Sequence, residues 1–84
     1  MWETSTGIKM RAERQNVVLE ILRIAIREPE NLYAAYCTKK IYGSAISQNH
    51  VTVTRTLHYL VRKNILEFDH QDIYPARKYY RLVK

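Results

Sequence analysis

Residues 46–66, ISQNHVTVTRTLHYLVRKNIL, decide the fold that we predict for this chain. Apolar side chains recur through this stretch at helical spacing and predict a single buried stripe. The stripe consists of Ile46, Val53, Leu57, Leu60 and Val61. Asn64 suits the left-handed backbone conformation that ends many helices. We therefore predict a helix over residues 47–64, with Ser47 or Asn49 as its N-cap.

Two further helices are predicted before this stretch. The first covers residues 8–28 and ends there, because Pro29 disfavours helical backbone at the residue that precedes it. Residues 1–7, before this helix, are expected to be flexible. The second helix and its following turn cover residues 29–46, with Pro29 in the first turn of the helix and Gly43 in the turn.

A β-hairpin is predicted to close the chain over residues 65–84. Residues 65–69 alternate between apolar and polar side chains, and residues 77–83 form a second β-rich segment. About eight residues join the two strands, so we expect a long tip. The fold class is therefore α+β and mostly α, with three helices followed by a two-stranded hairpin in one domain over residues 1–84.

The central stretch resembles the recognition-helix segment of MarR-like and related winged helix-turn-helix regulators. In that family a Thr-Val-Ser/Thr-Arg core precedes two leucines three residues apart, a basic residue, a glycine or asparagine stop and an apolar pair. The matching residues are Thr52, Val53, Thr54, Arg55, Leu57, Leu60, Lys63, Asn64, Ile65 and Leu66. The resemblance covers residues 15–84, and the small size and composition are similar to winged-helix regulators of crenarchaeal viruses and plasmids. It implies a winged helix fold and a transcription regulator that binds DNA.

The charge distribution also indicates a polyanionic partner. The net charge is +6, and residues 32–66 contain five cations and no acid. These cations are Lys39, Lys40, Arg55, Arg62 and Lys63. A block of this kind is typical of a surface that binds nucleic acid, although a solvated basic face without a partner is the alternative.

The resemblance places the third helix in the major groove of double-stranded DNA. Arg55 would then contact guanine, Gln48 or Asn49 would contact adenine, and the methyl groups of Val51 and Thr52 would contact thymine. The remaining expected contacts are with the backbone. They involve Ser47 at the helix start, Tyr59, Arg62, Lys39 and Lys40, and the wing residues Arg77 and Lys78, which could also enter the minor groove.

Each of these assignments has a structural alternative. Arg55 could pair with Glu67 or another carboxylate, and Gln48 and Asn49 could serve only as caps. Tyr59 could pack on the wing. Arg77 and Lys78 could be a solvated strand edge that discourages aggregation. At the level of function, the alternatives are a non-specific architectural protein that binds nucleic acid and a winged-helix module that binds other proteins.

The first helix carries apolar residues around most of its circumference. Val18, Ile21, Leu22 and Ala25 form the face that we expect against the core, and Val17 and Ile24 fall outside it. A second apolar patch suggests a second partner. We therefore assign Val17, Ile21 and Ile24 to a homodimer interface, although other elements of the chain could bury both patches.

The sequence offers little support for catalysis, cofactors or metal. Cys37 has no second cysteine to pair with in the chain, and it is expected as a small buried residue; an intermolecular disulfide stays open. The histidines His50, His58 and His70 lack the spacing of zinc ligands, and His50 falls near the buried stripe. We expect no enzyme, no small-molecule ligand, no metal, no signal peptide and no membrane span, and hence a cytoplasmic protein.

Overall fold

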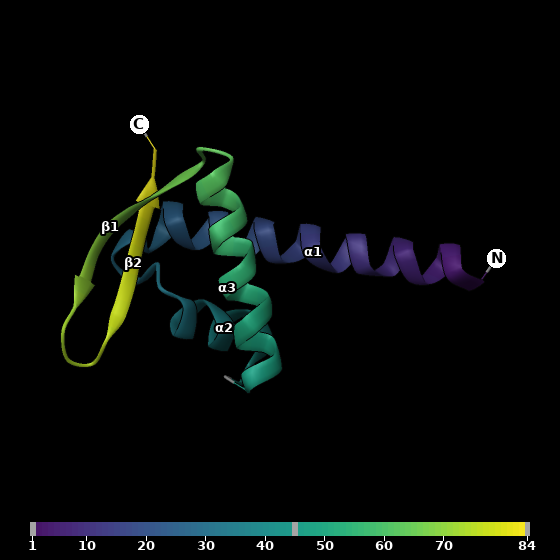
Figure 1. Cartoon of the computed structure of the whole chain (residues 1–84), viewed down its shortest axis with the longest axis horizontal. Coiled ribbons are helices and arrows are strands. Elements are labelled where there is room, and N and C mark those ends of the chain that lie inside the picture. Colours follow the sequence, from purple (N-terminus) through teal and green to yellow (C-terminus); the bar gives the residue numbers. More distant parts are fainter. Residues whose placement is uncertain (1, 45, 84) are drawn as a thin grey trace.

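Three α-helices precede a two-stranded antiparallel hairpin, which confirms the predicted element order (Figure 1). The computed structural model describes the backbone of residues 2–44 and 46–83, and side chains from residue 15 onward within these ranges. The elements are α1 (Trp2–Arg27), the 3-10 turn η1 (Pro29–Asn31), α2 (Ala34–Tyr42), α3 (Ser47–Arg62), β1 (Leu66–Asp72) and β2 (Arg77–Leu82).

The first two helices differ from the prediction at their starts. α1 begins at Trp2, so residues 2–7, which we expected to be flexible, continue the helix. α2 begins only at Ala34, after the turn η1 and an extended residue, Tyr33. The reason lies in the tertiary structure, because the carbonyl oxygen of buried Leu32 accepts a hydrogen bond of 3.0 Å from the amide of Tyr80 in β2. A helix through Leu32 would direct that carbonyl oxygen toward its own following turn.

The prediction for α3 is right in part at its end and wrong in its capping. Asn64 adopts the left-handed backbone that we predicted for it, with a φ of 61°, but the helix itself ends at Arg62, two residues before the predicted end. At the start, however, Ile46 is the N-cap residue and no side chain caps the helix. We predicted that Ile46 belongs to the buried stripe, but it is exposed. We also predicted Ser47 or Asn49 as the N-cap, and neither residue is the cap.

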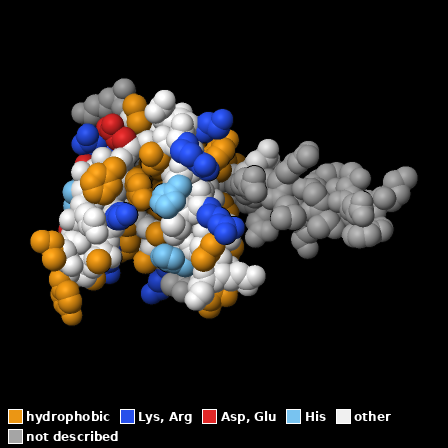
Figure 2. Space-filling view, in the orientation of Figure 1, with side chains coloured by type: hydrophobic (Ala, Val, Ile, Leu, Met, Phe, Trp, Pro, Cys, Tyr) orange, Lys and Arg blue, Asp and Glu red, His pale blue; other side chains and the backbone are white. Residues whose placement is uncertain are grey.

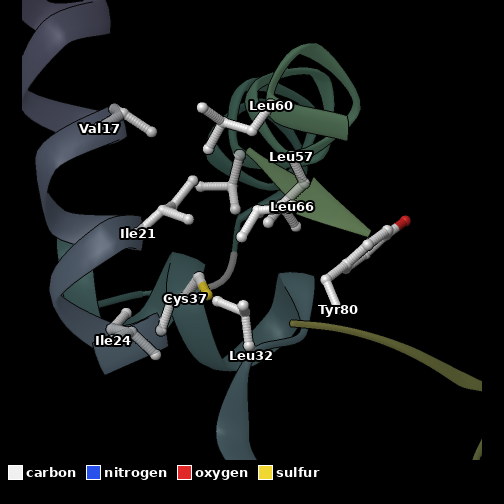
Figure 3. Packing of buried hydrophobic residues seen from close by; sticks show 11 residues of the cluster. Val17, Ile21, Ile24, Leu32, Cys37, Leu57, Leu60, Leu66 and Tyr80 are labelled. Carbon is white, nitrogen blue, oxygen red and sulfur yellow. The ribbon is translucent and has the colours of Figure 1, made fainter. Parts of the chain in front are cut away.

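The core lies where α1, α2, α3 and the start of β1 meet (Figure 3). Val17, Ile21 and Ile24 point from α1 toward Leu57 and Leu60 of α3 and toward Cys37 of α2. These residues are only 2%, 0% and 3% exposed to solvent, so they cannot contact a second chain. Our assignment of these three residues to a dimer interface was wrong, since the chain itself covers that face of α1.

The apolar residues that α1 leaves exposed lie on its opposite face. Leu19 and Ile26 are 53% and 70% exposed. They are seven residues apart, close to two helical turns, and at 100° per residue they fall about opposite the stripe of Val17, Ile21 and Ile24. α1 therefore has a second apolar face, at positions other than those we predicted.

The hairpin is longer in its strands and shorter at its tip than the sequence suggested. β1 and β2 pair from Leu66 opposite Leu82 to Asp72 opposite Arg77, so the turn contains only residues 73–76. The register shifts between Phe68 and His70, which leaves Asp69 as an extra residue. Such a bulge reverses which side chains of β1 share a face beyond it.

We expect Cys37 to react with a soluble aromatic disulfide near pH 8 only when the chain opens. The side chain is fully buried, and this burial raises the pKa of the Cys37 thiol to about 12, so the reactive thiolate is scarce. Labelling followed by absorbance should therefore be at least about 100-fold faster in denaturant than in native buffer. Fast labelling of a chain with an unchanged circular dichroism spectrum would contradict this burial. The same burial keeps the thiol out of reach of a second chain in this conformation.

Candidate nucleic-acid interface

One face of α3 is exposed along the whole helix. Because Val53, Thr56, Leu57 and Leu60 are buried, the opposite positions point to solvent. They are Gln48, Val51, Arg55, His58 and Arg62, at alternating spacings of three and four residues. His58 was absent from our sequence prediction, although its spacing from Arg55 and Arg62 already placed it on this line.

The cations of this face are not neutralised within the chain. Among the side chains that the structure describes, Arg55 and Arg62 have no carboxylate within ion-pair distance. The alternative that Arg55 pairs with Glu67 is wrong, because Glu67 is bound by Arg81 at 2.8 Å. Figure 2 shows the arrangement: Lys, Arg and His side chains gather over α3, whereas the acidic side chains in this view lie at the far edge of the hairpin.

The side chains that flank this exposed line on α3 differ in how exposed they are to solvent. Thr52 is half-buried, and its hydroxyl donates a hydrogen bond of 3.2 Å to the carbonyl oxygen of Gln48. Asn49 is also half-buried, whereas Ser47 is exposed. Tyr59 is exposed and does not line the groove between α3 and the hairpin; the ammonium of Lys63 lies 5.8 Å from its ring centroid. His50 is exposed, although its spacing from Val53 and Leu57 placed it near the buried stripe.

A groove separates the C-terminal half of α3 from the hairpin. It has a volume of about 460 Å³, an apolar floor and a rim with positive charge. Its lining residues are His58, Val61, Arg62, Phe68, Gln71, Lys78 and Tyr80. Arg62 and Lys78, which the sequence assigned to separate elements, are brought together on this rim. The groove is thus continuous with the exposed face of α3.

Arg77 and Lys78, two basic residues of the hairpin, do not share one face of it. Lys78 lines the groove, but the guanidinium of Arg77 lies 4.7 Å from the ring centroid of Tyr33, which also packs on Tyr79 at 5.0 Å. Adjacent residues of a strand point to opposite faces, so one strand cannot present both side chains to one surface. Both also belong to the strand β2 rather than to the tip. The two-residue period of a strand could have predicted from the sequence that Arg77 and Lys78 point to opposite faces.

The lysines of α2 also differ in their surroundings. Lys40 lies 3.5 Å from a carboxylate oxygen of Glu28, and the hydroxyl of Tyr36 donates a hydrogen bond of 2.5 Å to the same carboxylate. The hydrogen bond from Tyr36 and the charge of Lys40 lower the pKa of Glu28, and this carboxylate in turn raises the pKa of Lys40. Lys39 has no such partner among the described side chains. Of the two lysines, Lys39 is therefore the freer cation.

The acids of the hairpin are held away from the groove. Arg81 binds Glu67 at 2.8 Å and Asp69 at 3.1 Å, and both carboxylates raise the pKa of this guanidinium. His70 lies 2.7 Å from the other oxygen of Asp69 and stacks on Tyr79 at 4.3 Å. Asp72, the third acid of the hairpin, lies 3.9 Å from the other ring nitrogen of His70.

No three side chains of His, Cys, Asp or Glu within the described residues converge as a metal site would require. Within the same residues, no helix has the length and hydropathy to cross a bilayer. Comparison of the chain with protein-family models, curated proteins and solved structures gave no match.

Proposed function

We propose that this chain is a winged helix-turn-helix protein that binds double-stranded DNA in a sequence-specific manner and regulates transcription. In this proposal α3 lies in the major groove, and the hairpin is the wing that contacts the DNA backbone or the adjacent minor groove. The layout of three helices followed by an antiparallel hairpin is compatible with this fold.

One observation carries the proposal. The face of α3 that points away from the core presents Arg55 and Arg62 without carboxylate partners among the described side chains, and Lys78 of the wing lies on the same surface. An α-helix fits the major groove, and a face that mixes guanidinium, amide and methyl groups can bond base edges. Two of the three acids of the hairpin, Glu67 and Asp69, are by contrast bound by Arg81 away from this surface.

The geometry divides the predicted contacts into two groups. In the first half of α3, Gln48, Val51 and Arg55 are exposed together and would contact base edges. In the second half, Arg62 and Lys78 both line the groove, where they would contact phosphates. Arg77, Lys40 and Thr52 are held by other parts of the chain, so we expect smaller contributions from them.

A homodimer is part of the proposal, because a twofold pair of recognition helices reads two half-sites. Since Val17, Ile21 and Ile24 are buried, the dimer needs another surface. We propose the outer face of α1, where Leu19 and Ile26 are exposed two turns apart on one line. Two such helices could pack along this line as in a two-helix bundle.

We expect the double substitution Leu19→Glu and Ile26→Glu to give a folded monomer. Two carboxylates on each helix would be placed against like charges and apolar surface in the dimer, but they would remain in water in the monomer. Sedimentation velocity checks this result, and Ile73→Glu, which changes an exposed apolar residue of the hairpin turn, is the matched control. If the double variant has the sedimentation coefficient of a wild-type dimer, the interface is not on this face of α1. If the wild type is a monomer with and without DNA, the proposed dimer is wrong.

The function is tested by selecting binding sites from a random pool of duplexes. The selected and scrambled duplexes are then compared in a gel shift at two salt concentrations. A specific regulator should prefer the selected duplex by about 1,000-fold or more. Equal affinity for all duplexes, with a steep loss at higher salt, would favour the architectural alternative. No binding to any duplex would favour the protein-interaction module.

A further inference from the structure

Two large apolar side chains stand in solvent at the turn of the hairpin. Ile73 and Tyr74 are 94% and 96% exposed, more than any other large apolar residue described. The turn over residues 73–76 reads Ile-Tyr-Pro-Ala and has no charged side chain, whereas turns usually contain glycine, asparagine, aspartate or serine beside proline. Figure 2 shows this apolar end of the hairpin projecting at the lower left. Such exposure marks a contact with another molecule.

The position of the turn indicates which molecule it meets. The hairpin lies beside α3, and its turn is level with the first half of that helix (Figure 1). The last pair before the turn is Asp72 opposite Arg77, and the pair before it, Gln71 opposite Lys78, lines the groove. Glu67 and Asp69 are bound by Arg81 farther from the turn, and Asp72, which neighbours Gln71 in the strand, points to the other face of the hairpin. A polyanion that rests on α3 and Lys78 would therefore reach the turn without passing those acids.

We propose that Ile73 and Tyr74 form an apolar wedge that enters the minor groove of the bound duplex and partly unstacks one base step. This inference rests on the proposed function. The minor groove is about 6 Å wide, so it admits a hairpin turn edge-on. Isoleucine and proline are among the side chains that bend DNA by inserting between base steps.

A protein partner fits the turn less well. A stable interface buries about 800 Å² on each partner, whereas a side chain as large as tyrosine supplies at most about 250 Å². Lys78, the groove cation nearest the turn in the strand, also favours an anionic partner over an apolar one. The wedge would explain why this turn is apolar although the groove beside it is basic.

The test uses the full chain and a duplex selected from a random pool by the wild-type protein. The duplex carries 2-aminopurine at successive steps beside the site, and donor and acceptor dyes at its ends. We expect the wild type to raise the 2-aminopurine fluorescence at one step and to shorten the distance between the dyes. The double substitution Ile73→Ser and Tyr74→Ser should abolish both signals and weaken binding roughly tenfold, with the salt dependence unchanged.

Lys78→Ala is the matched control, because it should lower the salt slope by about one and leave the fluorescence signal intact. Ile73→Ser alone, which keeps the Tyr74–Pro75 pair, should give a partial loss. If the wild type binds the duplex without unstacking or bending it, or if the double variant keeps both signals, the wedge is overturned and the proposed function stands. If the double variant instead changes the sedimentation coefficient of the free protein, the turn is a protein contact, which also overturns the wedge. Failure of the wild type to bind any duplex overturns both.

Discussion

Arg55→Ala is expected to weaken binding to the selected duplex by about 1–3 kcal/mol, or roughly 5- to 150-fold. The guanidinium lies in the middle of the exposed line of α3 and has no carboxylate partner among the described side chains. Its two parallel donors can therefore bond guanine O6 and N7 without first breaking an ion pair. Binding to scrambled duplexes should barely change, because non-specific affinity depends on phosphate contacts.

The control for this prediction is Arg81→Ala. It removes the same charge from the chain, but from a guanidinium that binds Glu67 and Asp69 at the far edge of the hairpin. We expect it to leave the preference for the selected duplex unchanged. Fluorescence anisotropy with both duplexes distinguishes the outcomes. A loss of equal size on selected and scrambled DNA would show that Arg55 touches only phosphate, and would remove it from the base-reading group.

Leu57→Ala is expected to lower the free energy of unfolding by about 2–5 kcal/mol. Leu57 retains 1% of its exposure and packs among α1, α2 and β1, so the substitution leaves a cavity that the surrounding helices fill only in part. A domain of this size is stabilised by only about 5–15 kcal/mol. Denaturant unfolding followed by circular dichroism should therefore show a large shift of the midpoint with a similar slope.

Val51→Ala on the opposite face of α3 is the matched control. Val51 is exposed, and alanine has the higher helix propensity, so stability should change by less than about 0.5 kcal/mol. This substitution should nevertheless weaken binding to the selected duplex if its methyl groups contact thymine. Equal destabilisation by the two substitutions would mean that the two faces of α3 are not distinct, and the proposed interface would fail with them.

Periodicity predicted most of the fold because it is a local property. The positions of Val53, Leu57 and Leu60 fixed which face of the third helix is buried, and hence that Arg55 and Arg62 point the other way. Asn64 predicted the end of the helical segment because asparagine tolerates the left-handed backbone conformation that it adopts here. No acid occurs between residues 32 and 66, so the sequence also predicted that the cations of this helix have no carboxylate partner close to them in the chain.

The choice between two apolar faces of α1 could not be made in this way. Both the stripe of Val17, Ile21 and Ile24 and the line of Leu19 and Ile26 are apolar, and a helical period alone cannot say which of them the rest of the chain will cover. The decision depends on where α2, α3 and β1 pack. We assigned the dimer interface to the stripe that these elements bury.

The sequence by itself determined the order of the elements and the two faces of α3, because both follow from neighbours within a few residues. Only the tertiary structure decided the partners: Leu32 with Tyr80, Arg81 with Glu67 and Asp69, and Arg62 beside Lys78. These residues are 14 or more positions apart, except for Asp69, which reaches Arg81 through the bulge in β1. Contacts of this kind depend on how whole elements pack and on a one-residue shift in strand register, which local spacing does not encode.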